Sequence, residues 1–158
     1  ANTVGEIVIK GSNVTKGYKN NEKANKENFF DGWFKTGDLG KFDEDGFLFI
    51  SGRIKEIINK GGEKISPQEV DEVLMKHKAV FQAVCFSVKH EKLGEDIAAA
   101  VVLKDGATVS EKELKAYLSK SITTFKIPKQ ILILDEIPKG NTGKIQRIGL
   151  AKKLGLEL

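Results

Sequence analysis

The first third of the chain carries apolar clusters that predict β-strands. Residues 6–10 read Glu-Ile-Val-Ile-Lys, which is typical of a short strand. The largely apolar runs 39–42 and 47–50 flank the polar connector 43–46, which ends in Asp-Gly. Because glycine supplies the positive φ that a tight turn needs, this pattern predicts a β-hairpin.

The segment 20–28 breaks this pattern. It contains only Asn, Lys and Glu with one Ala, which indicates a solvated loop or an exposed turn. Residues 1–31 show no apolar periodicity that would let them build a core of their own. A short strand at 6–10 without a partner in the chain therefore suggests a missing neighbour.

Residues 56–69 predict a second hairpin followed by a helix. The runs 56–58 and 63–65 flank Asn59-Lys60-Gly61-Gly62, and this polar connector is typical of a turn. Ser66-Pro67-Gln68-Glu69 then reads as a capping box with proline at the first helical position. We therefore expect a helix to begin at Pro67.

The remaining sequence predicts alternating strands and helices. Ser110-Glu111-Lys112-Glu113 is a second capping box. Further elements are expected as strands at 79–88, 97–103 and 131–134 and as a short last helix at 146–154. This alternation indicates an α+β domain of roughly 100 residues.

The composition narrows the classes of protein and site. The chain has 158 residues, of which 40% are hydrophobic and 30% are charged, so a packed core is expected. Its single cysteine, Cys85, lies in an apolar run and is expected to be a core thiol; one cysteine excludes an intramolecular disulfide and a CxxC zinc site. With only two histidines besides, no metal site is expected.

No targeting or membrane segment is visible. No apolar run reaches the roughly 18 residues of a membrane span, and the start at Ala1 shows no secretory signal. The end, Gly155-Leu156-Glu157-Leu158, is not a Ser-Lys-Leu peroxisomal signal. We therefore expect a cytoplasmic protein in a reducing compartment.

The charge is mildly basic, with 26 Lys and Arg against 22 Asp and Glu and a net charge of +4. Positive residues gather in the last segment, at Lys139, Lys144, Arg147, Lys152 and Lys153. Such a tail binds nucleic acid or a phosphorylated ligand, or it is simply a solvated helix end. The absence of rows of aromatic residues for base stacking argues against nucleic acid.

Three polar motifs could carry chemistry. In Lys35-Thr36-Gly37-Asp38, the carboxylate of Asp38 could hold the vicinal hydroxyls of a ribose, or it could close an Asx turn. Arg53 offers a planar fork for a phosphate or a ribose, and Gly61 and Gly62 allow a ligand to approach the backbone. The alternative for this second motif is an exposed charged hairpin.

The third motif is Pro138-Lys139-Gly140-Asn141-Thr142-Gly143-Lys144. A lysine on a glycine-rich loop can be delivered to a phosphate and withdrawn again, and the alternative is a basic surface turn. The motif is not a P-loop, because Ile145 follows Lys144 where a serine or threonine is required.

In this order, the motifs resemble the C-terminal part of the adenylate-forming acyl-CoA synthetases, the AMP-binding superfamily shared with nonribosomal-peptide adenylation domains and luciferase. The residues that carry the resemblance are Gly5-Glu6-Ile7 with Gly17-Tyr18, Gly32-Trp33-Phe34-Lys35-Thr36-Gly37-Asp38-Leu39, Asp45-Gly46-Phe47, Gly52-Arg53-Ile54-Lys55-Glu56-Ile57-Ile58, Gly61-Gly62-Glu63-Lys64-Ile65-Ser66-Pro67-Gln68-Glu69-Val70, Phe125-Lys126-Ile127-Pro128 and Pro138-Lys139-Gly140-Asn141-Thr142-Gly143-Lys144-Ile145. The resemblance covers nearly the whole chain, and residues 52–70 look most like the oxalate–CoA ligase and 4-coumarate-like branch.

The resemblance implies a two-step acid–CoA ligase. Such enzymes use ATP and Mg²⁺ to convert a carboxylate to an acyl-adenylate and then transfer the acyl group to coenzyme A. Lys144 would be the catalytic lysine of the first step, Asp38 and Arg53 would bind the nucleotide, and Lys55 would be the hinge. Gly61 and Gly62 would line the tunnel for the pantetheine arm of coenzyme A.

The resemblance also implies a fold and a missing part. Residues 1–53 would be the β-rich edge of a large N-terminal domain, and residues 54–158 a small mobile domain with a mixed β-sheet flanked by helices and a β-hairpin. The family's phosphate loop, acyl pocket and Mg²⁺-binding Thr-Glu pair have no counterpart here. The partners would be the missing N-terminal domain and a small carboxylic acid, and the chain alone is expected to be inactive.

Other functions remain open at this point. A nonribosomal-peptide adenylation domain would pass its acyl group to a carrier protein, yet no carrier-domain serine motif follows. A non-catalytic module that binds nucleic acid or a partner protein would use the basic tail as its footprint. A truncated regulatory paralogue is a further possibility. Some relatives carry a lysine where Asn59 stands, and neither Asn59 nor Lys60 is given a role.

Overall fold

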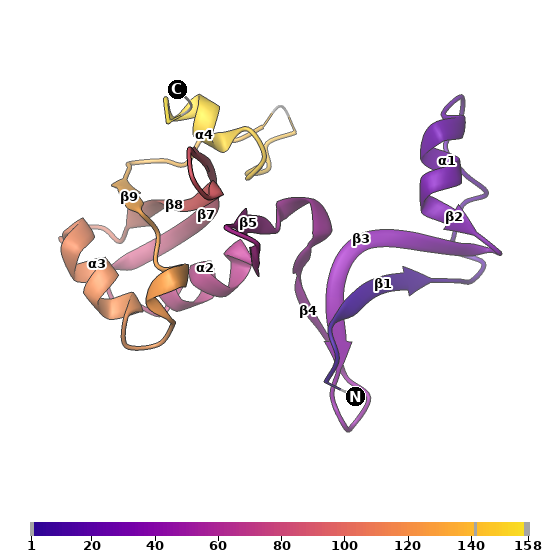
Figure 1. Ribbon diagram of the computed structural model, residues 1–158, viewed down its shortest axis with the longest axis horizontal. Coiled ribbons are helices and arrows are strands. Elements are labelled where there is room, and N and C mark those ends of the chain that lie inside the picture. The colour runs from indigo at the N-terminus through magenta and orange to yellow at the C-terminus, as the bar shows by residue number, and fades with distance from the viewer. Residues whose placement is uncertain (1, 141, 157–158) are drawn as a thin grey trace. The chain divides into compact units, whose positions relative to one another are not determined.

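The chain divides into two compact units, Ala1–Lys55 (unit 1) and Glu56–Leu158 (unit 2), in a computed structural model that describes residues 2–140 and 142–156 (Figure 1). Ala1, Glu157 and Leu158, on which the expectations about terminal signals rest, lie outside the described residues. Asn141 of the predicted lysine loop also lies outside them. Within the described part, no helix is both long and apolar enough to cross a lipid bilayer.

Unit 1 is built on one long strand. Its antiparallel sheet contains β1 (Gly5–Ile9), β2 (Phe29–Phe30), β3 (Trp33–Phe42) and β4 (Leu48–Arg53), and β3 pairs with the other three. The predicted hairpin between β3 and β4 is confirmed. Its connector is closed by the Asp43 carboxylate, which accepts the backbone N–H groups of Asp45 and Phe47.

Two expectations for unit 1 are wrong. The strand β1 does have a partner in the chain, because β3 begins at Trp33 and is long enough to pair with β1 and with β4. The polar segment expected to be a loop contains the helix α1 (Glu22–Asn28). Asn21 caps this helix by accepting the N–H of Ala24, and Asn25 bonds in both directions to the backbone of Tyr18. Local polar bonds therefore hold a helix that has no apolar stripe.

Unit 1 has a thin interior. Among the residues that the structure describes, every buried apolar side chain belongs to unit 2. The hairpin of unit 1 instead exposes a run of large apolar side chains, at Phe42, Phe47, Leu48, Phe49 and Ile50. Residues 2–31 likewise contain no buried apolar side chain.

Unit 2 is an α+β layer structure with a mixed sheet. The strands β6 (Glu63–Ile65), β5 (Ile58–Lys60), β8 (Gly94–Leu103) and β7 (Val80–His90) pair antiparallel in that order, and β9 (Gln130–Ile133) pairs parallel to β8. The helices are α2 (Pro67–Met75), α3 (Glu111–Leu118) and α4 (Leu150–Lys153), with the short 3-10 turn η2 (Thr124–Lys126). A further 3-10 turn, η1 (Ile54–Glu56), contains the last residues of unit 1 and the first residue of unit 2. The expected α+β fold class is confirmed.

The sheet of unit 2 is buried on both faces. Ala83 and Cys85 of β7 belong to a buried cluster with α2 and α3, whereas Val84 and Phe86 belong to a second cluster with α4. Side chains alternate between faces along a strand, so both sets must be apolar. The uninterrupted apolar runs of β7 and β8 follow from this arrangement.

The helix ends follow the sequence in part. The capping box at α3 is confirmed, because Ser110 accepts the N–H of Glu113 and the Glu113 carboxylate accepts the N–H of Ser110. The capping box predicted for α2 is wrong: the Ser66 side chain makes no capping bond, and the carboxylate of Glu69 pairs with Lys126 at 2.7 Å.

The last helix is shorter than expected and spans only Leu150–Lys153. Gly149 precedes it in a left-handed conformation with φ of +79°, which no α-helix can continue through. The residues before Gly149 therefore lie outside the helix and follow a different path along unit 2.

Candidate functional site

Asp38 and Arg53 lie directly opposite each other on β3 and β4. Arg53 Nε lies 2.7 Å from Asp38 Oδ1 in an ion pair, and the backbone N–H of Asp38 donates to the Thr36 hydroxyl at 3.0 Å. The Arg53 side chain is 63% exposed and that of Asp38 is 26% exposed. The structure thus brings these two predicted residues together as a pair that a ligand can reach.

Gly61 and Gly62 form the turn between β5 and β6. Both have positive φ, as a two-residue type I′ turn requires, and Lys60 pairs with Glu63 across it. The N–H of Gly61 donates to the Leu93 carbonyl at 2.9 Å, and the N–H of Gly62 donates to Asn59 Oδ1 at 3.1 Å. The turn is therefore exposed but held on both sides.

Lys60 anchors this turn through buried contacts. Its ammonium lies 2.6 Å from Asp96 Oδ1, donates to the Phe125 carbonyl at 3.1 Å and lies over the Phe125 ring. The side chains of Lys60 and Asp96 are only 11% and 7% exposed. Sequence reasoning assigned no role to Lys60, and the structure makes it the buried anchor of the hairpin.

Lys144 is exposed at the end of a tight loop, residues 139–145 (the lysine loop). Lys139 and Ile145 form an antiparallel bridge, and the N–H of Gly140 donates to the Lys144 carbonyl at 2.7 Å. Ile145 packs against the apolar cluster that contains the fully buried Ile137. The backbone on both sides of Lys144 is thus tied down while its side chain faces solvent.

Lys55 lies in η1, at the end of unit 1 and next to Glu56, the first residue of unit 2. Its side chain is exposed. Within the described residues, no cluster of three or more His, Cys, Asp or Glu side chains could hold a metal ion.

Arg147 is the charged residue that sequence reasoning misplaced. It was expected to belong to a solvated basic tail or a nucleic-acid footprint, yet its side chain is only 19% exposed. Arg147 Nε donates to Glu56 Oε2 at 3.0 Å, and Nη1 donates to Asp71 Oδ2 at 2.6 Å and to the Cys85 carbonyl at 2.9 Å. We call Glu56, Asp71 and Arg147 the arginine cluster.

A sequence signal for this cluster existed. The buried positions of α2 are Pro67, Val70, Asp71 and Leu74, so Asp71 lies within the apolar stripe of the helix. A carboxylate at such a position needs a partner. Asp71 also accepts the backbone N–H of Cys85 at 2.5 Å, and burial raises the pKa of the Cys85 thiol well above its usual range, as expected of a core thiol.

Burial raises the pKa of Asp71 from 3.8 to about 6, because loss of hydration outweighs the attraction of Arg147. Between about pH 4 and pH 6 the folded state therefore binds a proton that the unfolded state does not. The stability gained from this proton is fully present below about pH 4 and is lost as the pH rises through about 6. Relative to Asp71→Asn, the wild-type free energy of unfolding should rise by about 3 kcal/mol from about pH 7 to about pH 4. Urea denaturation of both proteins checks this, and parallel pH profiles would contradict it.

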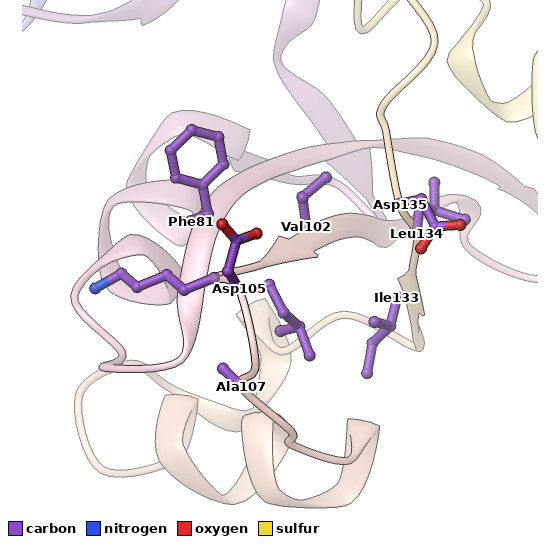
Figure 2. A pocket seen from close by; sticks show the side chains of 9 residues that line it. Phe81, Val102, Asp105, Ala107, Ile133, Leu134 and Asp135 are labelled. Atoms are coloured by element: carbon purple, nitrogen blue, oxygen red, sulfur yellow. The ribbon is translucent and has the colours of Figure 1, made fainter.

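A groove of about 720 Å³ lies elsewhere on unit 2, between the ends of β8 and β9. Figure 2 shows Phe81 and Asp105 on one side of it and Ile133 and Asp135 on the other. None of the site residues predicted from the sequence lines this groove.

Comparison with known proteins identifies the family. Residues 69–144 match the AMP-binding enzyme C-terminal domain. These residues belong to that family. The resemblance predicted from the motifs is thereby confirmed. The chain is 56% identical to an oxalate–CoA ligase of Arabidopsis thaliana over 92% of its length and 50% identical to an oxalate–CoA ligase of Saccharomyces cerevisiae over 94%.

Solved structures share this fold. One is o-succinylbenzoate CoA synthetase from Bacillus subtilis in complex with its acyl-adenylate intermediate, with a TM-score of 0.85, 40% identity and 94% of this chain covered. Another is ATP-bound MatB from Rhodopseudomonas palustris, with a TM-score of 0.88, 35% identity and 96% covered. The chain spans only 28% of each oxalate–CoA ligase and 30% of each of these two structures.

Proposed function

We propose that these residues act within an ATP-dependent acid–CoA ligase. In the first step, a carboxylate oxygen attacks the α-phosphorus of ATP, forming an acyl-adenylate and releasing pyrophosphate. In the second step, the thiol of coenzyme A attacks the acyl carbon and releases AMP. The observation that carries this proposal is the 56% identity to an acid–CoA ligase across 92% of the chain.

Lys144 is the catalytic residue of the first step in this proposal. The reaction brings an anionic carboxylate onto an anionic phosphate, and an ammonium group between them would offset the repulsion as charge develops in the transition state. The Lys144 side chain is exposed, and backbone hydrogen bonds hold the lysine loop in place. This arrangement suits a cation that contacts a ligand bound outside unit 2.

Asp38 and Arg53 are the proposed nucleotide-binding pair. A carboxylate can accept hydrogen bonds from both hydroxyls of a ribose, and a guanidinium can donate hydrogen bonds to hydroxyl or phosphate oxygens. Their ion pair at 2.7 Å fixes both side chains, and the exposure of Arg53 leaves its outer edge accessible.

Lys55 is the proposed hinge, and Gly61 and Gly62 are proposed to line the pantetheine tunnel. Lys55 lies at the division between the two units, which suits a residue about which one unit rotates against the other. The glycine turn exposes backbone without side chains, so a narrow ligand arm could pass close to it.

The remaining partner in this proposal is a large N-terminal domain that precedes unit 1. Unit 1 contributes no buried apolar side chain among the described residues, and its hairpin exposes a run of apolar residues. Such a surface is expected where a further part of the protein covers it. In this proposal, the missing part would also hold the Mg²⁺ ion that accompanies ATP.

The test is acid-dependent release of pyrophosphate by the gene product that carries these residues, with ATP, Mg²⁺ and coenzyme A. The panel begins with oxalate, because two relatives are named oxalate–CoA ligases, and continues through other small carboxylic acids. Release with at least one acid and formation of its CoA thioester are expected. Thioester formation only on a phosphopantetheinylated carrier protein would point to a peptide-synthetase domain instead. No release with any acid would leave a non-catalytic module.

Asp38→Asn should weaken the use of ATP. Losing a charged acceptor for the ribose costs about 1.5–3 kcal/mol, so the KM for ATP should rise roughly tenfold to a hundredfold. Asp45→Asn is the matched control, because Asp45 is an exposed carboxylate in the turn of the same hairpin. Steady-state kinetics of both variants measures the effect. An equal KM for ATP in the two variants would show that Asp38 is not part of the nucleotide site.

A further inference from the structure

The arginine cluster joins four parts of unit 2 through one guanidinium. Glu56 comes from η1, Asp71 from α2, the Cys85 carbonyl from β7, and Arg147 from the segment that follows the lysine loop. Glu56 is the first residue of unit 2. The cluster therefore connects the start of the unit to the segment that carries Lys144, which is three residues before Arg147.

Stability alone does not account for this cluster. It places two carboxylates around one cation, and Asp71 is only 3% exposed. Buried ion pairs often stabilise a fold no better than apolar residues of the same size. Burial raises the pKa of Asp71 to about 6, so its ionised form lowers the stability of the fold at neutral pH. A role in fixing geometry explains the arrangement better.

The geometry of the loop supplies that role. After Lys144, the side chain of Ile145 packs inward, that of Gln146 is exposed, and that of Arg147 turns inward again. The inward contacts of Ile145 and Arg147 hold the backbone that follows Lys144, while the Lys144 side chain stays exposed. Ile145 supplies an apolar contact without direction, whereas Arg147 makes three directional bonds.

We propose that Arg147 is a positioning residue for Lys144. Its guanidinium ties the second arm of the lysine loop to η1, α2 and β7, so that the loop moves with unit 2 as one body and presents the Lys144 ammonium in one orientation. This inference rests on the proposed function of Lys144. Because a small misplacement of a catalytic group has a large effect on rate, loosening the arm should slow the adenylation step specifically.

Lysine cannot replace Arg147 in this arrangement. Nε and Nη1 bond to carboxylates on two different elements, and the planar fork fixes their separation. A single ammonium at the end of a flexible stem would choose one partner. Arg147→Lys is therefore expected to behave like a loss of the anchor although it keeps the charge.

The first test uses the 158-residue chain and needs no activity. Removing Arg147 alone would leave the Asp71 carboxylate buried without its cation. The test variant is therefore Asp71→Asn/Arg147→Met. The amide oxygen introduced at position 71 can still accept the backbone N–H of Cys85. Amide exchange of Gly140, which donates to the Lys144 carbonyl, should become about tenfold faster or more. Exchange at Leu114 in the core reports global stability and should change much less. Lys152→Met, which removes an exposed charge from the same tail, should leave both amides as in wild type.

The second test compares half-reactions in the full gene product. In the double variant, pyrophosphate release should fall about tenfold to a hundredfold, while thioester formation from supplied acyl-adenylate stays within about twofold. Lys152→Met should match wild type in both. If Gly140 exchange is unchanged, or if release is unchanged while Lys144→Ala loses it, the positioning role is wrong. If Gly140 exchange accelerates but Lys144→Ala releases pyrophosphate normally, the proposed role of Lys144 is the part that fails.

Discussion

Replacing Lys144 by alanine in the full gene product is expected to slow acid-dependent pyrophosphate release roughly a hundredfold to a thousandfold. This is the size of effect seen when one preorganised donor to a developing charge is removed from an active site. The lysine loop itself should survive, because its bridge between Lys139 and Ile145 and its Gly140 bond use backbone atoms only. Stopped-flow detection of pyrophosphate measures the change.

The second half-reaction supplies the internal control. Thioester formation from supplied acyl-adenylate needs no ammonium between two anions, so Lys144→Ala should leave it nearly unchanged. Lys112→Ala removes an exposed lysine from α3 and should leave both half-reactions as in wild type. Equal loss of both half-reactions in Lys144→Ala would indicate a structural defect and would falsify the assignment.

Lys60→Met is expected to destabilise unit 2 by about 3–5 kcal/mol. The substitution keeps the length of the side chain but leaves the Asp96 carboxylate, 7% exposed, without the ammonium that lies 2.6 Å from it. An unpaired buried charge of this kind is among the most costly point changes in a protein. Because Lys60 also bonds the Phe125 carbonyl, the loop that contains η2 should loosen as well. Urea denaturation of the 158-residue chain gives the free energy.

The double variant Lys60→Met/Asp96→Asn separates charge from packing. Without the carboxylate there is no buried charge to compensate, so most of the lost stability should return. Lys64→Met, at the exposed end of the same hairpin, should change the free energy of unfolding by no more than about 0.5 kcal/mol. If the double variant is as unstable as Lys60→Met, the loss comes from packing of the lysine stem rather than from the unpaired charge.

Short sequence patterns correctly predicted the elements that depend on residues close together in the chain. The capping box at Ser110 and Glu113 is closed by bonds between residues three apart, and the Gly61-Gly62 turn needs only the positive φ of two glycines. The apolar runs of β7 and β8 reflect burial on both faces of one sheet. The helix α1 was missed because it is held by the Asn21 cap and by the bonds of Asn25 to the Tyr18 backbone rather than by an apolar stripe.

The charged residues were harder to place, because residue type alone does not show whether a charged side chain is buried. Arg147 was grouped with exposed lysines, and only the inward alternation after Ile145 could have set it apart. Asp71 lies in the apolar stripe of α2, which was a usable signal for a buried carboxylate. Lys60 had no such signal, since it follows an exposed asparagine in a polar turn.

Residue type and short spacing were enough to predict the family resemblance and the alternation of strands and helices, and to select Asp38, Arg53 and Lys144 as candidates. The tertiary structure decided which charges pair. Arg147 meets Glu56 across 91 positions of the chain, and Lys60 meets the Phe125 carbonyl across 65. Such partners are selected by how the sheet and its helices pack, since burial makes an unpaired charge costly and leaves only the nearest opposite group to satisfy it.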